Sequence, residues 1–139
     1  MRARRKPRIP PTAILNPQDM ARAVRSLMRE EQETFVAIYL NVKNVMIGEP
    51  HVVAIGTVHE VDVSPRDVFR EAIRRNACGV VVSHNHPSGD STPSTEDLAL
   101  TTRLRAAGTI LGIPVVDHVV VTAYGHTSIA EYAQLRTET

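Results

Sequence analysis

The sequence predicts an α/β protein built on a mixed β-sheet that is flanked by helices. Segments rich in apolar and β-branched residues, which are typical of strands, alternate along the chain with segments whose apolar residues recur at helical spacing. Several links between successive strands are too short to hold a crossover helix. Some neighbouring strands must therefore run antiparallel, which makes the predicted sheet mixed.

The composition is that of one globular domain. The chain has 139 residues, of which 42% are hydrophobic and 22% charged, values that are ordinary for a protein with a single core. No apolar run approaches the roughly 18 residues of a membrane span, and no apolar segment follows the basic N-terminus as in a secretory signal. The single cysteine, Cys78, excludes an internal disulfide, is predicted to be a small core residue, and favours a cytoplasmic location.

Positive charge is concentrated at the N-terminus. The first eight residues carry five basic groups and no acid, although the formal net charge of the chain is only +1. Three prolines keep this stretch extended, so residues 1–12 are predicted to be a disordered tail and residues 13–139 a single domain. The tail could contact nucleic-acid phosphates, but a solvated tail is the simpler interpretation. The absence of tryptophan leaves no obvious platform for base stacking.

The first half of the chain is predicted to hold one helix and two or three strands. A helix is expected over residues 17–31, because an Asn-Pro pair typical of a helix start precedes apolar residues at helical spacing. Residues 34–40 and 51–58 have the composition of strands. Residues 44–47 between them are a candidate short strand, followed by a turn.

The second half alternates helices and strands. Glycine is typical of helix ends, so Gly79 and Gly108 are the predicted stops of two helices. Ser128 and Glu131 have the spacing of a capping box. The predicted elements are a helix over residues 64–77, a strand buried on both faces over 80–84, a loop over 85–93, a helix over 94–107, a strand over 114–121 and a closing helix that begins near Ser128.

Two histidines and an aspartate give the strongest functional signal. His84 and His86 lie at the end of the buried strand, and because they are one residue apart they share a face. Two imidazoles placed in this way can meet the spacing of tetrahedral zinc ligands, about 3.3 Å. Asp97, eleven residues after His86, can add a carboxylate oxygen. One Zn²⁺ with three protein ligands keeps a fourth position for water, the arrangement of a catalytic site.

Asp97 also has a structural interpretation. Ser94 and Asp97 have the spacing of a capping box, with the serine at the N-cap. Both interpretations predict the same helix start, and they differ in whether the carboxylate turns back to the cap or outward to a metal. The spacing to both histidines favours the metal. The other histidines, His51, His59 and His126, are predicted to be structural or exposed.

The whole pattern, His-x-His-Pro, six residues, then Ser-x-x-Asp, resembles the signature of the JAMM (MPN+) metalloprotease family. The run from His84 to Asp90, with Pro93 and Ser94 after it, resembles the RadC branch of that family. The likeness covers roughly residues 32–133. It implies the α/β fold of JAB/MPN domains, which is similar to that of cytidine deaminases, together with a zinc ion and cleavage of an amide or isopeptide bond.

The resemblance also implies roles for two further residues. Ser94 matches the serine that helps to stabilise the oxyanion formed at the scissile carbonyl. The family places its general base, a glutamate, just before an early apolar strand, and Glu33 is the best match. Glu30 and Glu31 are close competitors for this role, and all three glutamates also fit the polar end of the first helix.

Asp117 and His118 interrupt an otherwise apolar strand. One of them could hydrogen-bond a ligand histidine and fix its tautomer. A buried polar pair or a helix-capping contact explains them equally well, so both interpretations stay open. Asn85, in the loop after the buried strand, is predicted to satisfy its own backbone there.

The sequence therefore favours a zinc-dependent hydrolase that acts on a peptide or protein. A second hypothesis, also from the RadC resemblance, is a binding module of the DNA-repair or mobile-element type with little or no catalytic activity. A purely structural zinc site is the least favoured, because such sites close all four positions, mostly with cysteine and histidine.

Overall fold

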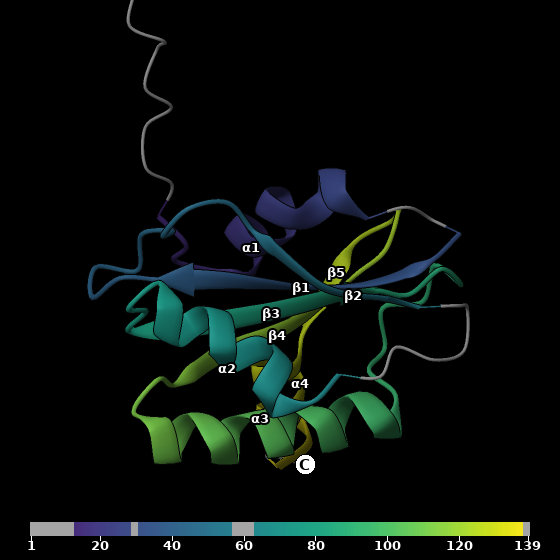
Figure 1. The fold of residues 1–139 in the computed structure, drawn as a ribbon. Helices are drawn as coiled ribbons and strands as arrows, with labels where there is room; N and C mark the ends of the chain where they lie inside the picture. Colours follow the sequence, from purple (N-terminus) through teal and green to yellow (C-terminus); the bar gives the residue numbers. More distant parts are fainter. Residues whose placement is uncertain (1–12, 29–30, 57–62, 138–139) are drawn as a thin grey trace, which may run out of the picture.

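A single five-stranded sheet organises the chain, with helices on both of its faces (Figure 1). The structure is a computed structural model, and it describes residues 13–28, 31–56 and 63–137. The elements are α1 (Pro17–Val24), a 3₁₀ turn η1 (Arg25–Leu27), β1 (Glu33–Leu40), β2 (His51–Gly56), α2 (Pro65–Arg74), β3 (Gly79–Asn85), α3 (Thr95–Leu111), β4 (Val115–Val121), β5 (His126–Ser128) and α4 (Ile129–Thr137).

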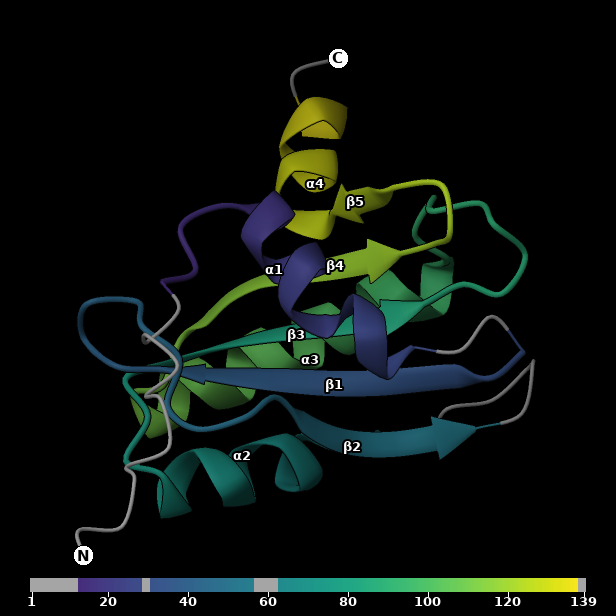
Figure 2. The same ribbon diagram turned by 90° about the horizontal axis from the view of Figure 1, so that it is seen from above.

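The sheet is mixed, as the short links predict. Its strand order is β2-β1-β3-β4-β5, and Figure 2 shows the strands side by side. β1 is antiparallel to both β2 and β3, and β4 is antiparallel to β5. β3 and β4 are parallel, and α3 forms the crossover between them. The end of β3 therefore lies beside the start of β1.

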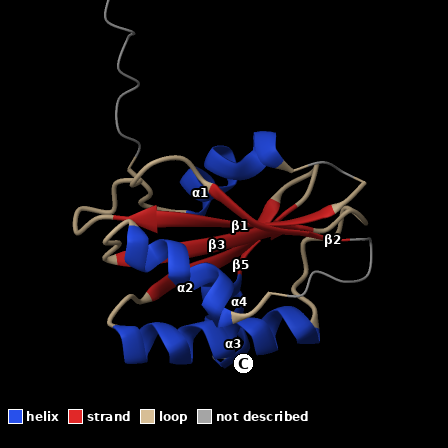
Figure 3. Cartoon of the chain, viewed as in Figure 1, coloured by secondary structure: helices blue, strands red, loops and turns tan. Residues whose placement is uncertain are grey.

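Helices cover the sheet on both sides, and each side has its own core. α2 and α3 lie on one face and α1 on the other, as the colouring of Figure 3 makes plain, while α4 packs against β4 and β5. Side chains alternate along β1, so that Phe35 and Tyr39 join the core on the α2–α3 side, whereas Val36 and Ile38 join the core under α1. β3 is buried along its whole length, which confirms the prediction of a strand covered on both faces.

The first helix is shorter than predicted. α1 ends at Val24, and the chain continues as the 3₁₀ turn η1 before Met28 takes an extended conformation. Met20 and Val24 are buried, but Leu27 is 38% exposed. The apolar spacing that predicted a helix over residues 17–31 therefore continues past the part of the helix that packs on the sheet.

The third helix is longer than predicted, because Gly108 does not end it. α3 continues to Leu111, and Gly112 ends the helix in a left-handed conformation with φ of 71°. Gly108 instead allows a close approach of two backbone segments: a Cβ atom at this position would lie 2.5 Å from the carbonyl oxygen of Ile113. The glycine is needed for packing of α3 against the chain that leads into β4.

Four smaller features also differ from the sequence-based prediction. The second helix ends at Arg74, before residue 77. The candidate strand over residues 44–47 contributes only isolated bridges, and the sequence did not predict β5. Cys78 is exposed rather than part of the core.

Residues 1–12 and His59, for which the sequence also makes predictions, lie outside the described residues. Within the part of the chain that the structure describes, no helix has the length and apolar character needed to cross a membrane.

Candidate metal centre

The two motif histidines lie at the end of β3 and point to the side of the sheet that α3 covers. His84 follows Val80 and Val82 in the alternation along the strand, and both valines belong to the core on that side. His84 is buried, and His86, just past the strand, is half-buried. Their Nε2 atoms lie 3.0 Å apart. The strand therefore brings both imidazoles to one point, as their spacing predicts.

Asp97 meets both histidines from the first turn of α3. Its Oδ1 lies 3.0 Å from Nε2 of His84, and its Oδ2 lies 2.9 Å from Nε2 of His86. The capping box is present as well: the Ser94 N–H donates to Asp97 Oδ2 over 2.8 Å, and the Asp97 N–H donates to Ser94 Oγ over 3.0 Å. The capping interpretation is thus confirmed, and the same carboxylate also faces both histidines.

Glu33 is the glutamate that the structure brings to this cluster. It is the first residue of β1, and the antiparallel register pairs Phe35, two residues later, with His84. The carboxylate of Glu33 and the ring nitrogens of His84 and His86 lie within 4.8 Å of one another. Glu31 is exposed, and Glu30 lies outside the described residues.

Burial and hydrogen bonds set the charges in the cluster. Burial raises the pKa of Asp97, but contacts with His84 and His86 outweigh that effect and hold the pKa well below its usual value. The hydrogen bond with Asp97 raises the pKa of His86 against the opposing effect of burial. Burial keeps the pKa of His118, behind His84, well below its usual value. Asp97 is therefore an anion at neutral pH, and His118 is neutral.

The chemistry of these donors fits a zinc ion. Nδ1 of His86 lies 2.9 Å from the carbonyl oxygen of Asp90, which can only accept, so the ring carries a proton on Nδ1 and a neutral His86 has a lone pair on Nε2. That lone pair faces the carboxylate of Asp97 and the ring of His84. The separations of 2.9–3.0 Å between the facing atoms are close to the spacing of about 3.3 Å between tetrahedral zinc ligands. Imidazole nitrogen and carboxylate oxygen are ordinary zinc donors.

The structure separates the roles of Asp117 and His118. His118 is completely buried, and its Nε2 lies 2.7 Å from Nδ1 of His84. Asp117 instead binds the start of α4: it accepts from the Ser128 hydroxyl over 2.6 Å and from the Ala130 N–H over 3.1 Å. His118 is thus the residue that contacts a motif histidine, and Asp117 is the helix-capping contact.

Asn85 has a different role from the predicted one. Its side-chain oxygen accepts from the N–H of Thr34, and its side-chain nitrogen donates to the carbonyl of Gln32, both over 2.7 Å. The amide therefore holds the backbone on both sides of Glu33. The sequence offered no signal for this contact, because it depends on the pairing of β1 with β3.

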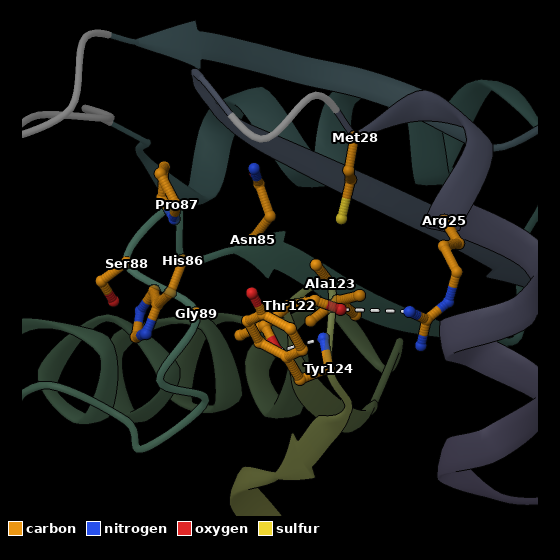
Figure 4. A pocket seen from close by; sticks show the side chains of 11 residues that line it. Arg25, Met28, Asn85, His86, Pro87, Ser88, Gly89, Thr122, Ala123 and Tyr124 are labelled. Atoms are coloured by element: carbon orange, nitrogen blue, oxygen red, sulfur yellow. Dashed lines mark hydrogen bonds between the residues drawn. The ribbon is translucent and has the colours of Figure 1, made fainter.

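A pocket of about 360 Å³ opens beside His86. Figure 4 shows His86 and Arg25 on opposite sides of it, with a hydrogen bond of 3.1 Å from the Arg25 guanidinium to the carbonyl of Thr122. Met28 and Tyr124 add apolar surface to the lining. Of the clustered side chains, only His86 lines this pocket, which therefore lies beside the cluster.

Comparison with known proteins identifies the relatives of the chain. The model of the RadC-like JAB domain matches residues 14–135. The chain is 47% identical over 109 residues to a UPF0758 protein of Carboxydothermus hydrogenoformans. The matched residues make up 78% of this chain and 48% of that protein. It is 44% identical over 120 residues to one of Bacillus cereus, with 86% and 53% covered. With one of Thermotoga maritima it shares 50% identity over 105 residues, with 76% and 47% covered. The chain thus spans about half the length of the curated relatives it matches.

Proposed function

The chain belongs to the RadC-like JAB domain family, and we propose that it is a zinc-dependent hydrolase that cleaves an amide or isopeptide bond in a peptide or protein. The observation that carries this proposal is the meeting of His84, His86 and Asp97. Two imidazole nitrogens and one carboxylate come within 3.0 Å of one another where β3 ends. Three protein donors with one position left for water are typical of catalytic zinc and not of structural zinc.

In this proposal His84, His86 and Asp97 hold one zinc ion. Zinc in such a site supplies Lewis acidity, which lowers the pKa of water and polarises the carbonyl group to be cleaved. Asp97 supplies the negative charge of the donor set, and its capping contact with Ser94 fixes the direction of the carboxylate.

Glu33 acts as the general base. Its carboxylate lies within 4.8 Å of the nitrogens of His84 and His86. From this position it can reach a water molecule that attacks the carbonyl group of a substrate beside the histidines. Glu33 takes a proton from that water and passes it to the leaving nitrogen. The contacts of Asn85 with the backbone on either side of Glu33 support this role, because they hold Glu33 beside the two histidines.

Ser94 stabilises the oxyanion in the same proposal. Its Oγ accepts from the Asp97 N–H, so the hydroxyl hydrogen is the atom that can donate to the oxygen of a tetrahedral intermediate.

Metal analysis tests the proposed site. We expect about one zinc per chain in the purified protein, and a loss of bound zinc in His86→Ala and in Asp97→Asn. The asparagine variant keeps a side-chain oxygen for the cap while it removes the charge. His126→Ala is the matched control, since His126 lies in β5 and is half-buried like His86. Its zinc content should equal that of the wild type.

A screen of peptide and isopeptide substrates then tests the reaction. Zinc-loaded protein should hydrolyse at least one of them, and a chelator should abolish the activity. A wild-type protein that binds no zinc when zinc is supplied would overturn the hydrolase and favour the alternative of a DNA-repair or mobile-element binding module. Nucleic-acid contact in that alternative depends on the basic tail within residues 1–12, which lie outside the described residues.

A further inference from the structure

A chain of hydrogen bonds leads from His84 away from the site and returns to it through α3. Nδ1 of His84 lies 2.7 Å from Nε2 of His118 on the neighbouring strand β4. Nδ1 of His118 lies 2.7 Å from Oγ1 of Thr101, and Thr101 Oγ1 lies 2.8 Å from the carbonyl oxygen of Asp97. Since Asp97 also contacts His84 through its carboxylate, these four residues form a closed ring.

We infer that Thr101 and His118 are positioning residues that fix the tautomer of His84, so that its Nε2 lone pair faces the site where zinc is proposed to bind. The inference rests on the proposed function, because zinc is the ligand that this lone pair would serve. Neither residue belongs to the donor set: Thr101 lies one helical turn after Asp97, and His118 lies behind His84.

The direction of each hydrogen bond follows from the one before it. If Nε2 of His84 binds zinc, the neutral imidazole of His84 carries its proton on Nδ1. The Nδ1–H group then donates a hydrogen bond to Nε2 of His118. A neutral His118 then has its own proton on Nδ1 and donates it to the hydroxyl of Thr101. The Thr101 hydroxyl in turn donates to the carbonyl of Asp97, which can only accept. Every proton in this arrangement has an acceptor.

Without zinc the same ring can be satisfied in the opposite direction. Thr101 then donates to Nδ1 of His118, Nε2 of His118 donates to Nδ1 of His84, and Nε2 of His84 donates to Oδ1 of Asp97 over 3.0 Å. The two arrangements contain the same number of protons. Binding of zinc at Nε2 of His84 is compatible only with the first, so it must select the tautomer of His118 as well, although His118 does not touch the ion.

The side chains around the closed ring of hydrogen bonds are apolar or already hydrogen-bonded, so its four residues have few other hydrogen-bond partners. Phe35 stacks on His84 with ring centroids 6.0 Å apart and meets His118 edge-on at 5.6 Å. Thr101 and His118 are both buried. Among the described residues, no buried side-chain nitrogen or oxygen lacks a hydrogen-bond partner. A fully satisfied network in apolar surroundings holds its members in one geometry, and here that geometry links β3, β4 and the helix that carries Asp97.

Histidine tautomers measured by long-range ¹H–¹⁵N NMR test the inference directly in the wild-type protein. With zinc bound, both His84 and His118 should carry their protons on Nδ1. A zinc-loaded protein in which His118 carries its proton on Nε2 would overturn the positioning role of Thr101 and His118 while leaving the metal site intact. A wild-type protein that binds no zinc would instead overturn the proposed function, so the two failures are distinguishable.

Variants of Thr101 test whether this residue helps to position His84. The quantity measured is the affinity for zinc, in competition with a chromophoric chelator. Thr101→Val keeps the shape of the side chain but removes the acceptor for the buried N–H of His118, and we expect zinc affinity to fall about tenfold or more. Thr101→Ser restores the hydroxyl and should restore most of the affinity. Thr102→Val is the matched control, because the Thr102 hydroxyl makes the same contact with the carbonyl four residues earlier, over 3.0 Å, on the exposed side of α3.

Three results would contradict the inference. Thr101→Val could bind zinc as the wild type does, Thr101→Ser could bind it no better than the valine variant, or Thr102→Val could lose as much affinity as Thr101→Val. If Thr101→Val does not fold, the tautomers of the wild-type protein still decide the question.

Discussion

At the scale of single residues, Ser94 and Asp97 show how one short motif serves a helix and a site together. The backbone N–H groups of these two residues are satisfied by each other's side chains, which stabilises the start of α3. The same contacts turn the Asp97 carboxylate toward both motif histidines. A substitution here therefore changes helix stability and site geometry at once, and experiments must separate the two effects.

Ser94→Gly separates capping from catalysis. Glycine at an N-cap costs only a few tenths of a kcal/mol relative to serine, whereas alanine costs about 1 kcal/mol. If the Ser94 hydroxyl stabilises the oxyanion, both variants should lose roughly 100-fold in turnover, while urea unfolding shows a clear loss of stability only for Ser94→Ala. Turnover that follows stability, with Ser94→Gly close to the wild type, would reduce Ser94 to a cap.

Glu33→Gln tests the general base without a large change in size. We expect turnover to fall at least about 100-fold, with zinc content unchanged because Glu33 is not in the proposed donor set. Glu31→Gln is the control, since Glu31 lies two residues earlier and is exposed. Parallel measurements of turnover and zinc content check the prediction, and near-normal turnover in Glu33→Gln would move the base elsewhere.

At the scale of elements, helix ends and close backbone contacts determine how α2 and α3 are placed on the sheet. α3 must lie near the chain that leads into β4, and the lack of a side chain at Gly108 permits this approach. α2 begins with a capping box in which Asp67 accepts from both the N–H and the hydroxyl of Ser64, each over 3.0 Å. Both helices pack on the sheet face that carries His84. The close contact at Gly108 and the capping box of α2 therefore help to place the helices that surround the site, although neither feature belongs to it.

Gly108→Ala should destabilise the protein. The added methyl would lie 2.5 Å from the carbonyl oxygen of Ile113, and the shift of α3 that relieves this overlap should lower the free energy of unfolding by about 1–3 kcal/mol. Gly125→Ala is the control, because a Cβ atom there meets no atom within 4 Å. Urea unfolding measures both, and equal stability of the two variants would contradict the packing role of Gly108.

The capping box of α2 should make a pH-dependent contribution to stability. Its hydrogen bonds with Ser64 lower the pKa of Asp67 from its usual 3.8. A carboxyl whose pKa is lower in the folded state stabilises the protein above the unfolded pKa and loses that effect as the pH falls through the folded value. Asp67→Asn should therefore be less stable than the wild type at pH 7, and the difference should shrink once the pH falls below about 4. Unfolding curves across this range check the sign, and a difference that grows toward low pH would contradict it.

At the scale of the whole molecule, the sequence predicts what depends on neighbours in the chain. The continuous apolar run that begins at Val80 predicts a strand buried on both faces. The spacing of His84 and His86 then predicts that both face the same side. The ring through Thr101 could not be predicted in this way, because it needs β3, β4 and α3 to be placed together. The role of Gly108 cannot be predicted for the same reason, because it depends on the position of Ile113 in space and not on the local pattern.

The candidate site joins three elements, so zinc should stabilise the fold as a unit. Glu33 comes from β1, the histidines from the end of β3, and Asp97 from α3. A ligand that binds only the folded state adds roughly 2.7 kcal/mol at a concentration 100 times its Kd, which for a domain of this size raises the melting temperature by roughly 5–10 °C. We expect this shift in the wild type and in His126→Ala, and none in His86→Ala. Calorimetry with and without zinc makes the measurement, and an equal shift in His86→Ala would place zinc at another site on the molecule.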